Sequence, residues 1–446
     1  DHRDLHSFPT RRSSDLRNNM ATLEIGGIDC KRLAEISGTP LLIYDEAKIE
    51  EQLAAATENF QSQRFETEVV YAAKAFSCKA IFEKVRQAGA GLDVVSGGEL
   101  YCAHQAGMPM EKVYFHGNNK SEEELRMALE LGCGTIVLDN DMECRKLTRL
   151  AEELKKPIQV LLRVNPGIEA HTHEYIRTSG SDSKFGISIA KKNEIKALVN
   201  IAMLSDYVQF KGFHSHIGSQ ITEAAAFEEA LAIMLGFIRE MRDGYNISTK
   251  HLSIGGGCGI RYTADDKPIP LGEMAEILAR TCERLLDEKG VRLEKLLIEP
   301  GRSIVGEAGY SLYKVGFSKD TDTKHFLFVD GGMSDNIRPA LYQADYSCDI
   351  ANRLGEAKNK TYCIAGKNCE SGDILIKEAK LPDTACEGDL LVMYATGAYG
   401  YSMASNYNRA GRPEVIFVKD GKARRVLKRE SYEDQLRLEA DEPLSL

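Results

Sequence analysis

The spacing of hydrophobic and polar residues predicts alternating strands and helices between residues 39 and 301. Short apolar runs, many of them β-branched, recur along this stretch and are separated by longer amphipathic segments. The runs occupy residues 40–44, 68–73, 91–96, 112–117, 134–139, 158–165, 210–218, 250–257 and 295–301. Repeated strand–helix units over about 250 residues favour an α/β fold with a parallel sheet closed into a (β/α)8, TIM-like barrel. An open doubly wound sheet is the main structural competitor.

Two of the segments between these runs carry clear helix signals. Residues 121–132 begin with Ser121 and Glu124, which have the spacing of a capping box, and they end at Gly132. The second segment, residues 224–243, is amphipathic throughout and predicts a longer helix.

Beyond Gly301 the pattern changes to short β-rich runs without long helical spacers. These runs occupy residues 309–319, 324–332, 361–366, 373–381, 389–399 and 413–429. The last run predicts a hairpin that turns at Asp420 and Gly421. We therefore expect a barrel over residues 45–300 and an all-β sandwich or barrel domain. The β domain would combine residues 20–44 with residues 301–436.

The first nineteen residues show no hydrophobic periodicity and lack the apolar segment of a secretory signal. They resemble translated adapter sequence, so we expect residues 1–19 to be a disordered, non-native extension. The folded protein is expected to begin at about Met20.

Composition narrows the function classes. Hydrophobic residues make up 43% and charged residues 28% of the 446 residues, as in ordinary globular proteins. The formal charge of −10 argues against a nucleic-acid partner, and no apolar run is long enough to cross a membrane. The 11 cysteines include no CxxC pair or zinc-type spacing, which indicates reduced thiols in a cytoplasm and no metal site.

Several candidate chemical groups follow predicted strands. Lys74 lies at the end of an apolar run, where a lysine of lowered pKa could form a Schiff base, although most such lysines are solvated. His214 and His216 lie two residues apart, so they could contact a flat cofactor or a metal, or they could be core residues. Ser219 follows them and could hold a phosphate oxygen.

Two further motifs leave alternatives open. The segment SIGGGCGIRY contains Gly255, Gly256 and Gly257, which fit either phosphate binding or a tight turn. In IEPGRS, Glu299 could pair with a pyridinium nitrogen, or it could form a structural ion pair with Arg302.

The predicted β domain carries three more motifs. Cys369 and Glu370 stand in a glycine-bounded loop, where a thiol could donate a proton or could simply be a surface residue. Tyr399 belongs to a tyrosine-rich loop that could serve only hairpin packing, and Arg338 precedes Tyr342 by four residues.

The joint order of these motifs, namely YAxKA, HxHIGSQ, GGG, EPGR, CES and GAY, is highly specific. The sequence resembles the diaminopimelate decarboxylases, a family of fold-type III pyridoxal-phosphate enzymes, from about Met20 to about Leu436. One departure is the loop GKNCES, where many members have a proline before the Cys–Glu pair.

The resemblance implies roles around the cofactor pyridoxal 5′-phosphate. Lys74 would hold it as a Schiff base, Asp93 would lie near that lysine, and His216 would stack on the pyridine face. Glu299 would contact the pyridine nitrogen. The remaining cofactor-binding residues implied by the resemblance are Ser219, Gly255, Gly256, Gly257, Pro300, Gly301, Arg302 and Tyr399.

The resemblance also implies a substrate, meso-2,6-diaminopimelate, and its decarboxylation to L-lysine and CO2, the last step of lysine biosynthesis. Cys369 would be the proton donor, delivered by the partner subunit of a homodimer with shared active sites. The implied substrate-binding residues are Arg302, Arg338, Tyr342, Glu370 and Tyr399. Two arginines and a glutamate suit a second amino-acid end, which carries both a carboxylate and an ammonium.

Three alternatives remain at this point. Decarboxylases of ornithine, arginine or carboxynorspermidine share the scaffold, and amino-acid racemases share the barrel and the lysine. A non-enzymatic pyridoxal-phosphate homeostasis protein would share the barrel, but it would lack the β domain.

Overall fold

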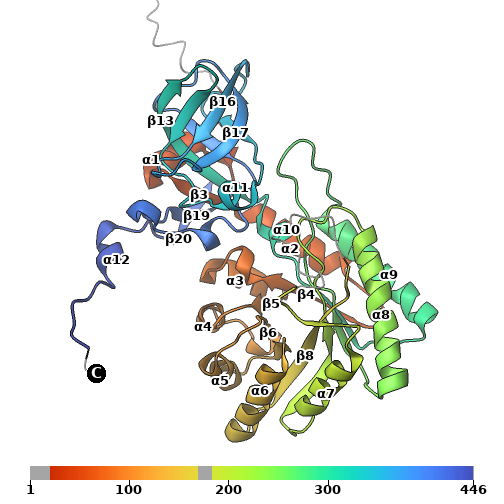
Figure 1. The fold of residues 1–446 in the computed structure, drawn as a ribbon. Coiled ribbons are helices and arrows are strands. Elements are labelled where there is room, and N and C mark those ends of the chain that lie inside the picture. Colours follow the sequence, from red (N-terminus) through yellow and green to blue (C-terminus); the bar gives the residue numbers. More distant parts are fainter. Residues whose placement is uncertain (1–20, 169–182, 445–446) are drawn as a thin grey trace, which may run out of the picture.

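The computed structural model describes residues 21–168 and 183–444 (Figure 1). The extension expected over residues 1–19 lies outside the described residues.

Within the described residues, eight parallel strands close into a ring. They are β4 (Glu66–Ala72), β5 (Gly91–Val94), β6 (Val113–Phe115), β7 (Thr135–Leu138), β8 (Ile158–Asn165), β10 (Val208–His214), β11 (His251–Ser253) and β12 (Lys295–Ile298). The ring is closed because β12 pairs with β4 and β10 pairs with β8. The prediction of a TIM-like barrel is therefore confirmed, and the open-sheet competitor is wrong. A short strand, β9 (Ile187–Ser188), pairs in parallel with the end of β8.

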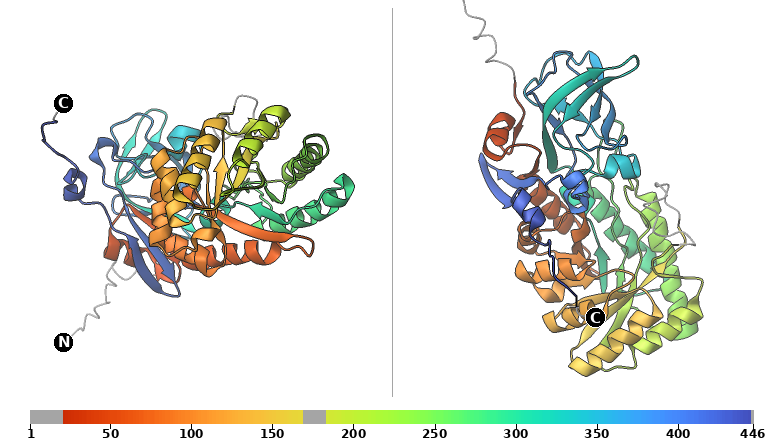
Figure 2. Two further views of the ribbon diagram at one scale, coloured as in Figure 1. Left: turned by 90° about the horizontal axis from the view of Figure 1, so that it is seen from below. Right: turned by 60° about the vertical axis from the view of Figure 1, so that its left-hand side comes forward.

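Helices surround the ring and shield its apolar strands from water (Figures 1 and 2). They are α2 (Glu46–Asn59), α3 (Lys79–Gln87), α4 (Gly97–Gln105), α5 (Glu122–Leu131), α6 (Asp141–Leu154), α7 (Lys192–Ala202), α8 (Ala225–Tyr245) and α9 (Leu271–Lys289). The two predicted helices are confirmed as α5 and α8. The capping box of Ser121 and Glu124 is present, and Gly132 ends α5 with a left-handed φ of 77°.

A second sheet stands at one end of the barrel (Figure 1). Its order is β17 (Ile374–Leu381), β16 (Lys360–Ala365), β14 (His325–Val329), β13 (Gly309–Asp320), β3 (Leu41–Asp45), β19 (Glu414–Lys419) and β20 (Lys422–Leu427). Two further strands, β15 (Cys348–Ile350) and β18 (Leu390–Met393), join it through β13. The predicted hairpin of β19 and β20 is confirmed, with positive φ values of 50° at Asp420 and 71° at Gly421.

The β-rich part also contains helices that the sequence pattern did not indicate. They are α1 (Cys30–Ser37), α10 (Arg302–Val305), α11 (Arg338–Tyr342) and α12 (Tyr432–Leu436), with short 3-10 turns at Tyr401–Met403 and Tyr407–Arg409. The barrel has two such turns, at Ala73–Ala75 and Met110–Lys112. A small hairpin, β1 (Glu24–Ile25) and β2 (Ile28–Asp29), precedes α1. Most of these helices span five residues or fewer, too few turns to produce a recognisable apolar period.

One apolar cluster joins the barrel to strands β3 and β19 of the second sheet. The Tyr44 ring of β3 stacks on Phe76, which follows β4, at 4.4 Å between centroids, and Phe417 of β19 lies 5.6 Å from Tyr44. All three side chains are fully buried. The chain thus fixes the β-rich part directly against the carboxyl ends of the barrel strands, which is where β/α barrels place their active sites.

Candidate active site

A cavity of about 650 Å³ lies at the carboxyl ends of the barrel strands, where loops of the second sheet cover them. Most of the sequence-predicted site residues line it: Lys74, Asp93, His216, Ser219, Gly256, Gly257, Glu299, Gly301, Arg302, Arg338, Tyr342 and Tyr399. Gly255 and Pro300 adjoin this wall in the chain. Cys369 and Glu370 are not among its lining residues.

Lys74 stands on the 3-10 turn that directly follows β4. Its neighbours Ala73 and Ala75 are buried, so the turn is anchored while the lysine side chain faces the cavity. The carbonyl oxygen of Ala75 accepts two hydrogen bonds from the second sheet's loop, from the Tyr399 N–H and the Ser402 hydroxyl, each at 2.8 Å. The loop carrying Tyr399 therefore fixes the backbone that carries Lys74.

Glu299 ends β12 and is the most heavily supported carboxylate of the cavity. His214 Nε2 lies 3.0 Å from one carboxylate oxygen, and the Ser253 hydroxyl donates to the other at 2.6 Å. Burial opposes ionisation of Glu299, but His214, His116 and these hydrogen bonds hold its pKa well below the ordinary value. The cavity therefore keeps a carboxylate ionised in its wall.

Asp93 behaves in the opposite way. Burial, followed by the charge of Glu299, raises the pKa of Asp93 well above its ordinary value. His116 Nε2 lies 3.7 Å from Asp93 Oδ1 and 3.5 Å from Glu299, and burial holds the pKa of His116 well below its ordinary value. Among the described residues, neither Asp93 Oδ1 nor His116 Nε2 has a hydrogen-bond partner, so the wall presents free polar atoms to a ligand.

The three glycines of the GGG motif are required by the protein's own packing. Gly255 has a φ of 72°, and a Cβ on Gly256 would lie 2.0 Å from the Glu299 carbonyl oxygen. A Cβ on Gly257 would lie 2.3 Å from the carbonyl oxygen of Gly218. Close backbone packing therefore requires glycine here, and the segment also brings bare backbone to the cavity beside Ser219.

Two buried arginines reach the cavity from different elements. Arg302 opens α10 and its Nη2 donates to the Ser219 hydroxyl at 2.9 Å, whereas Arg338 opens α11 and its Nη1 donates to the Tyr346 hydroxyl at 2.5 Å. Within the part of the chain that is described, neither guanidinium lies within 4.0 Å of a carboxylate. The structural Glu299–Arg302 ion pair considered above is thus not found, and both cations are available to an anionic ligand.

Cys369 and Glu370 lie on the surface of the second sheet's loop and are exposed. The Cys369 N–H donates to the Asn408 side chain at 2.7 Å, and the Tyr407 hydroxyl donates to the Cys369 carbonyl at 3.4 Å. The loop is therefore held in a defined shape away from the cavity of its own chain.

Sequence reasoning missed several lining residues, including His116, Asn118, Arg163, Phe185 and Tyr262. His116 directly follows β6, so the strand-end rule that found Lys74 could have found it. Tyr262 follows the glycine motif by a few residues, but nothing in the sequence showed that its loop turns back toward the cavity.

His116, His214 and Glu299 also bring possible metal-ligand atoms within 4.8 Å of one another, and all three residues belong to this same cavity wall. Among the helices in the described ranges, none combines the length and apolar character needed to traverse a bilayer.

Comparisons with known proteins agree with this site. Residues 46–306 match the pyridoxal binding domain of the pyridoxal-dependent decarboxylases. The chain is 49% identical to a diaminopimelate decarboxylase of Bacillus subtilis, covering 95% of this chain and 96% of that protein. It is 44% identical to one of Staphylococcus aureus, covering 93% and 96%.

Solved structures agree as well. A diaminopimelate decarboxylase from M. jannaschii, 33% identical, superposes with a TM-score of 0.86 over 96% of this chain and 99% of that chain. These similarities extend over both the barrel and the second sheet. The chain therefore belongs to the diaminopimelate decarboxylase family of pyridoxal-dependent decarboxylases.

Proposed function

We propose that this chain decarboxylates meso-2,6-diaminopimelate to L-lysine and CO2 with pyridoxal 5′-phosphate held at Lys74. The observation that carries the proposal is one cavity that combines Lys74 and the ionised Glu299 with two buried arginines lacking carboxylate partners. A substrate without a second carboxylate would leave Arg338 without an anion to bind, even though the cofactor phosphate would contact Arg302. A relative from M. jannaschii has been solved in complex with L-lysine, the proposed product.

The cavity suits the cofactor chemically. Bound there, pyridoxal phosphate supplies an electron-withdrawing ring that accepts the electron pair left when CO2 departs. The ionised Glu299 would hold a proton on the ring nitrogen, and Asp93 and His216 would lie about the lysine and the ring face. The phosphate would be bound by Ser219, the Gly255–Gly257 turn, Gly301, Arg302 and Tyr399, with Pro300 shaping that turn. The unpartnered polar atoms of Asp93, His116 and Arg302 support a bound polar group.

The substrate end that does not react would be held by arginines and tyrosines. Arg302 and Arg338 would bind its carboxylate as bidentate partners, with Tyr342 and Tyr399 beside them. Glu370 would bind its ammonium.

A second copy of the chain would complete each site. Cys369 and Glu370 are exposed and absent from the cavity wall of their own chain, so they would act in a partner's cavity within a homodimer. The Cys369 thiol would protonate the carbon from which CO2 has left. A cytoplasmic location is part of this proposal, and the 11 free cysteines suit such a reducing compartment.

The decisive experiment measures CO2 release from meso-diaminopimelate by the purified protein, with and without added pyridoxal phosphate. We expect cofactor-dependent release of one CO2 for each L-lysine formed. Faster turnover of ornithine, arginine or carboxynorspermidine than of diaminopimelate would overturn the substrate assignment.

The shared site has its own test. The Lys74→Ala variant, expected to be inactive, and the Cys369→Ala variant, expected to turn over slowly with cofactor bound, are mixed under conditions that exchange subunits. Because each mixed dimer contains one intact site, we expect recovery of roughly one quarter of the wild-type activity. No recovery despite demonstrated subunit exchange would contradict a site built from two chains.

A further inference from the structure

Tyr262 lies between the two arginines of the cavity. It is buried, with 8% of its surface exposed, and lies on the loop that follows the glycine turn. Arg302 Nη1 donates a hydrogen bond to the Tyr262 hydroxyl, and the Arg302 guanidinium carbon lies 5.7 Å from the ring centroid. The Arg338 guanidinium carbon lies 4.9 Å from the same centroid. One ring therefore contacts both cations.

Arg338 is also held from a second direction by Tyr346. Its guanidinium carbon lies 5.6 Å from the Tyr346 ring centroid, and its Nη1 donates to the Tyr346 hydroxyl at 2.5 Å. The rings of Tyr262 and Tyr346 meet edge to face, 5.3 Å apart and at 85°. A buried guanidinium without a nearby carboxylate gains its electrostatic compensation from such aromatic faces and hydroxyls.

The position of Tyr262 is itself fixed by both parts of the molecule. Its N–H donates to Asp266 Oδ2 at 3.0 Å within the barrel loop. Its carbonyl oxygen accepts a hydrogen bond from the Ser347 hydroxyl at 3.0 Å, and Ser347 follows Tyr346 in the second sheet's loop. Tyr262 therefore cannot move without disturbing contacts to both the barrel and the second sheet.

We propose that Tyr262 is a positioning residue which, together with Tyr346, orients Arg338 and Arg302 toward the carboxylate of the substrate's non-reacting end. This inference rests on the proposed function and adds a residue that determines the preference for a substrate with a second amino-acid end. The aromatic faces themselves use no guanidinium N–H group, and the hydroxyls of Tyr262 and Tyr346 each accept from a single nitrogen. A protein carboxylate would instead compete directly with a ligand carboxylate for the paired N–H groups.

The test compares two competitive inhibitors of diaminopimelate decarboxylation. L-lysine retains the carboxylate of the non-reacting end, whereas cadaverine, the diamine left when lysine loses CO2, keeps both ammonium groups but has no carboxylate. For Tyr262→Leu we expect the inhibition constant of L-lysine to rise about 10- to 30-fold, as for loss of a desolvated cation–π contact. The constant for cadaverine should stay within about twofold of the wild-type value, because that ligand does not use the arginines.

Two further variants separate positioning from loss of folding. Tyr262→Phe keeps the ring and should change the L-lysine constant less than about fivefold, corresponding to one lost hydrogen bond. Tyr346→Leu removes the second ring at Arg338, so it should also weaken the binding of L-lysine more than the binding of cadaverine. Tyr394→Phe serves as the matched control, because Tyr394 also pairs edge to face with a tyrosine but lies outside the cavity wall.

Cofactor absorbance of each variant verifies that the holoenzyme forms. Equal weakening of L-lysine and cadaverine binding, or unchanged L-lysine binding in both leucine variants, would overturn the positioning role of Tyr262. The proposed function would still hold in that case if the wild-type protein turns over diaminopimelate. A wild-type protein that does not turn over diaminopimelate would overturn both.

Discussion

The charged side chains of the cavity differ in whether groups of opposite charge or hydrogen-bond partners surround them. Glu299 is hydrogen-bonded by His214 and Ser253, whereas Arg302 and Arg338, within the described ranges, contact hydroxyl groups and aromatic faces rather than carboxylates. Because an unpaired buried cation is costly, this asymmetry is best explained by anions that arrive with the ligand. The cavity therefore combines one ionised acid with two cations that have no carboxylate partner among the described residues.

Replacing Lys74 with alanine tests the lysine at the end of β4. We expect Lys74→Ala to abolish both the visible absorbance of protein-bound cofactor and decarboxylation, because no second lysine among the described residues lines the cavity to form the Schiff base. Absorbance spectroscopy and CO2 release measure the two losses. The control is Lys79→Ala, an exposed lysine at the start of α3, which should retain both properties. Activity retained by Lys74→Ala would contradict the role of this lysine.

His251 predicts a pH dependence of stability. Burial, followed by the charges of Lys295 and Lys211, lowers the pKa of His251 from 6.5 to about 4. Between about pH 6.5 and pH 4, the unfolded chain binds a proton at His251 that the folded chain does not bind. The contribution of His251 to stability is therefore fully present above about pH 6.5 and is lost as the pH falls toward 4.

The test measures the free energy of unfolding in urea at pH 7 and pH 5. Because His251 is partly exposed, we expect His251→Gln to reduce the difference between the two pH values by about 1–2 kcal/mol. His104→Gln, at an exposed position near the end of α4, should leave that difference unchanged. An equal pH dependence in wild type and His251→Gln would refute the assignment.

At the scale of elements, the candidate catalytic and cofactor-binding residues lie just beyond the carboxyl ends of the parallel strands. Lys74 follows β4, Glu299 follows β12, and His216 follows β10, so residues far apart in sequence meet at one rim of the barrel. The glycine turn after β11 allows this convergence, because any side chain at Gly256 would collide with the backbone of Glu299. Strand order and glycine placement together therefore set the distances within the site.

The capping box of α5 predicts a measurable contribution to folding. Ser121→Ala removes the acceptor for the Glu124 N–H, and we expect a loss of about 1 kcal/mol in the free energy of unfolding. Urea unfolding monitored by circular dichroism measures it. Ser431→Ala is a matched control: α12 has the same capping box but buries no residue, so its fraying should leave global stability unchanged. Equal effects of the two substitutions would show that packing of α5 does not matter.

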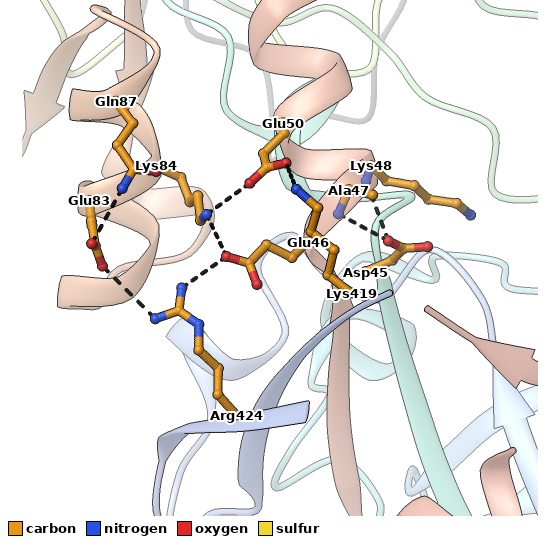
Figure 3. Close-up of polar contacts among 10 residues, drawn as sticks. All are labelled: Asp45, Glu46, Ala47, Lys48, Glu50, Glu83, Lys84, Gln87, Lys419 and Arg424. Atoms are coloured by element: carbon orange, nitrogen blue, oxygen red, sulfur yellow. Dashed lines mark hydrogen bonds and ion pairs between the residues drawn. The ribbon is translucent and has the colours of Figure 1, made fainter. Parts of the chain in front are cut away.

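At the scale of the whole molecule, charged side chains join the barrel to the second sheet (Figure 3). Glu46 of α2 lies 2.5 Å from Lys84 of α3 and 3.0 Å from Arg424 of β20, and Glu50 links Lys84 to Lys419 of β19. This charged network lies beside the apolar contact of Tyr44, Phe76 and Phe417 described above. The second sheet is thereby held so that its Tyr399 loop reaches the Lys74 turn.

Glu46→Gln tests this charged connection. Only 11% of the Glu46 side chain is exposed, so we expect its neutralisation to cost about 2 kcal/mol in the free energy of unfolding, by leaving Lys84 and Arg424 less compensated. Urea unfolding at low and high salt measures the effect. Glu35→Gln is the control, because the Glu35–Arg32 pair is exposed and should contribute less than about 0.5 kcal/mol. An equally small effect of Glu46→Gln would show that apolar packing alone joins the two sheets.

The local pattern of residues was sufficient to predict the elements themselves. The alternation of apolar runs and amphipathic segments determined the eight barrel strands, and Ser121, Glu124 and Gly132 determined the ends of α5, because caps and periodicity act over a few residues. The motif order also indicated the family, and most of the site residues predicted from it line the cavity.

Only the tertiary structure decided how these elements combine. The pairing of β3 between β13 and β19, the two donors to the Ala75 carbonyl, and the place of Tyr262 between two arginines all join residues distant in sequence. No local signal encodes such contacts, because they form only when the barrel closes and the second sheet packs on its rim. The sequence by itself therefore determined which reactive and charged side chains this protein has. The tertiary structure decided which of those side chains pair with one another and which face the cavity without a charged partner.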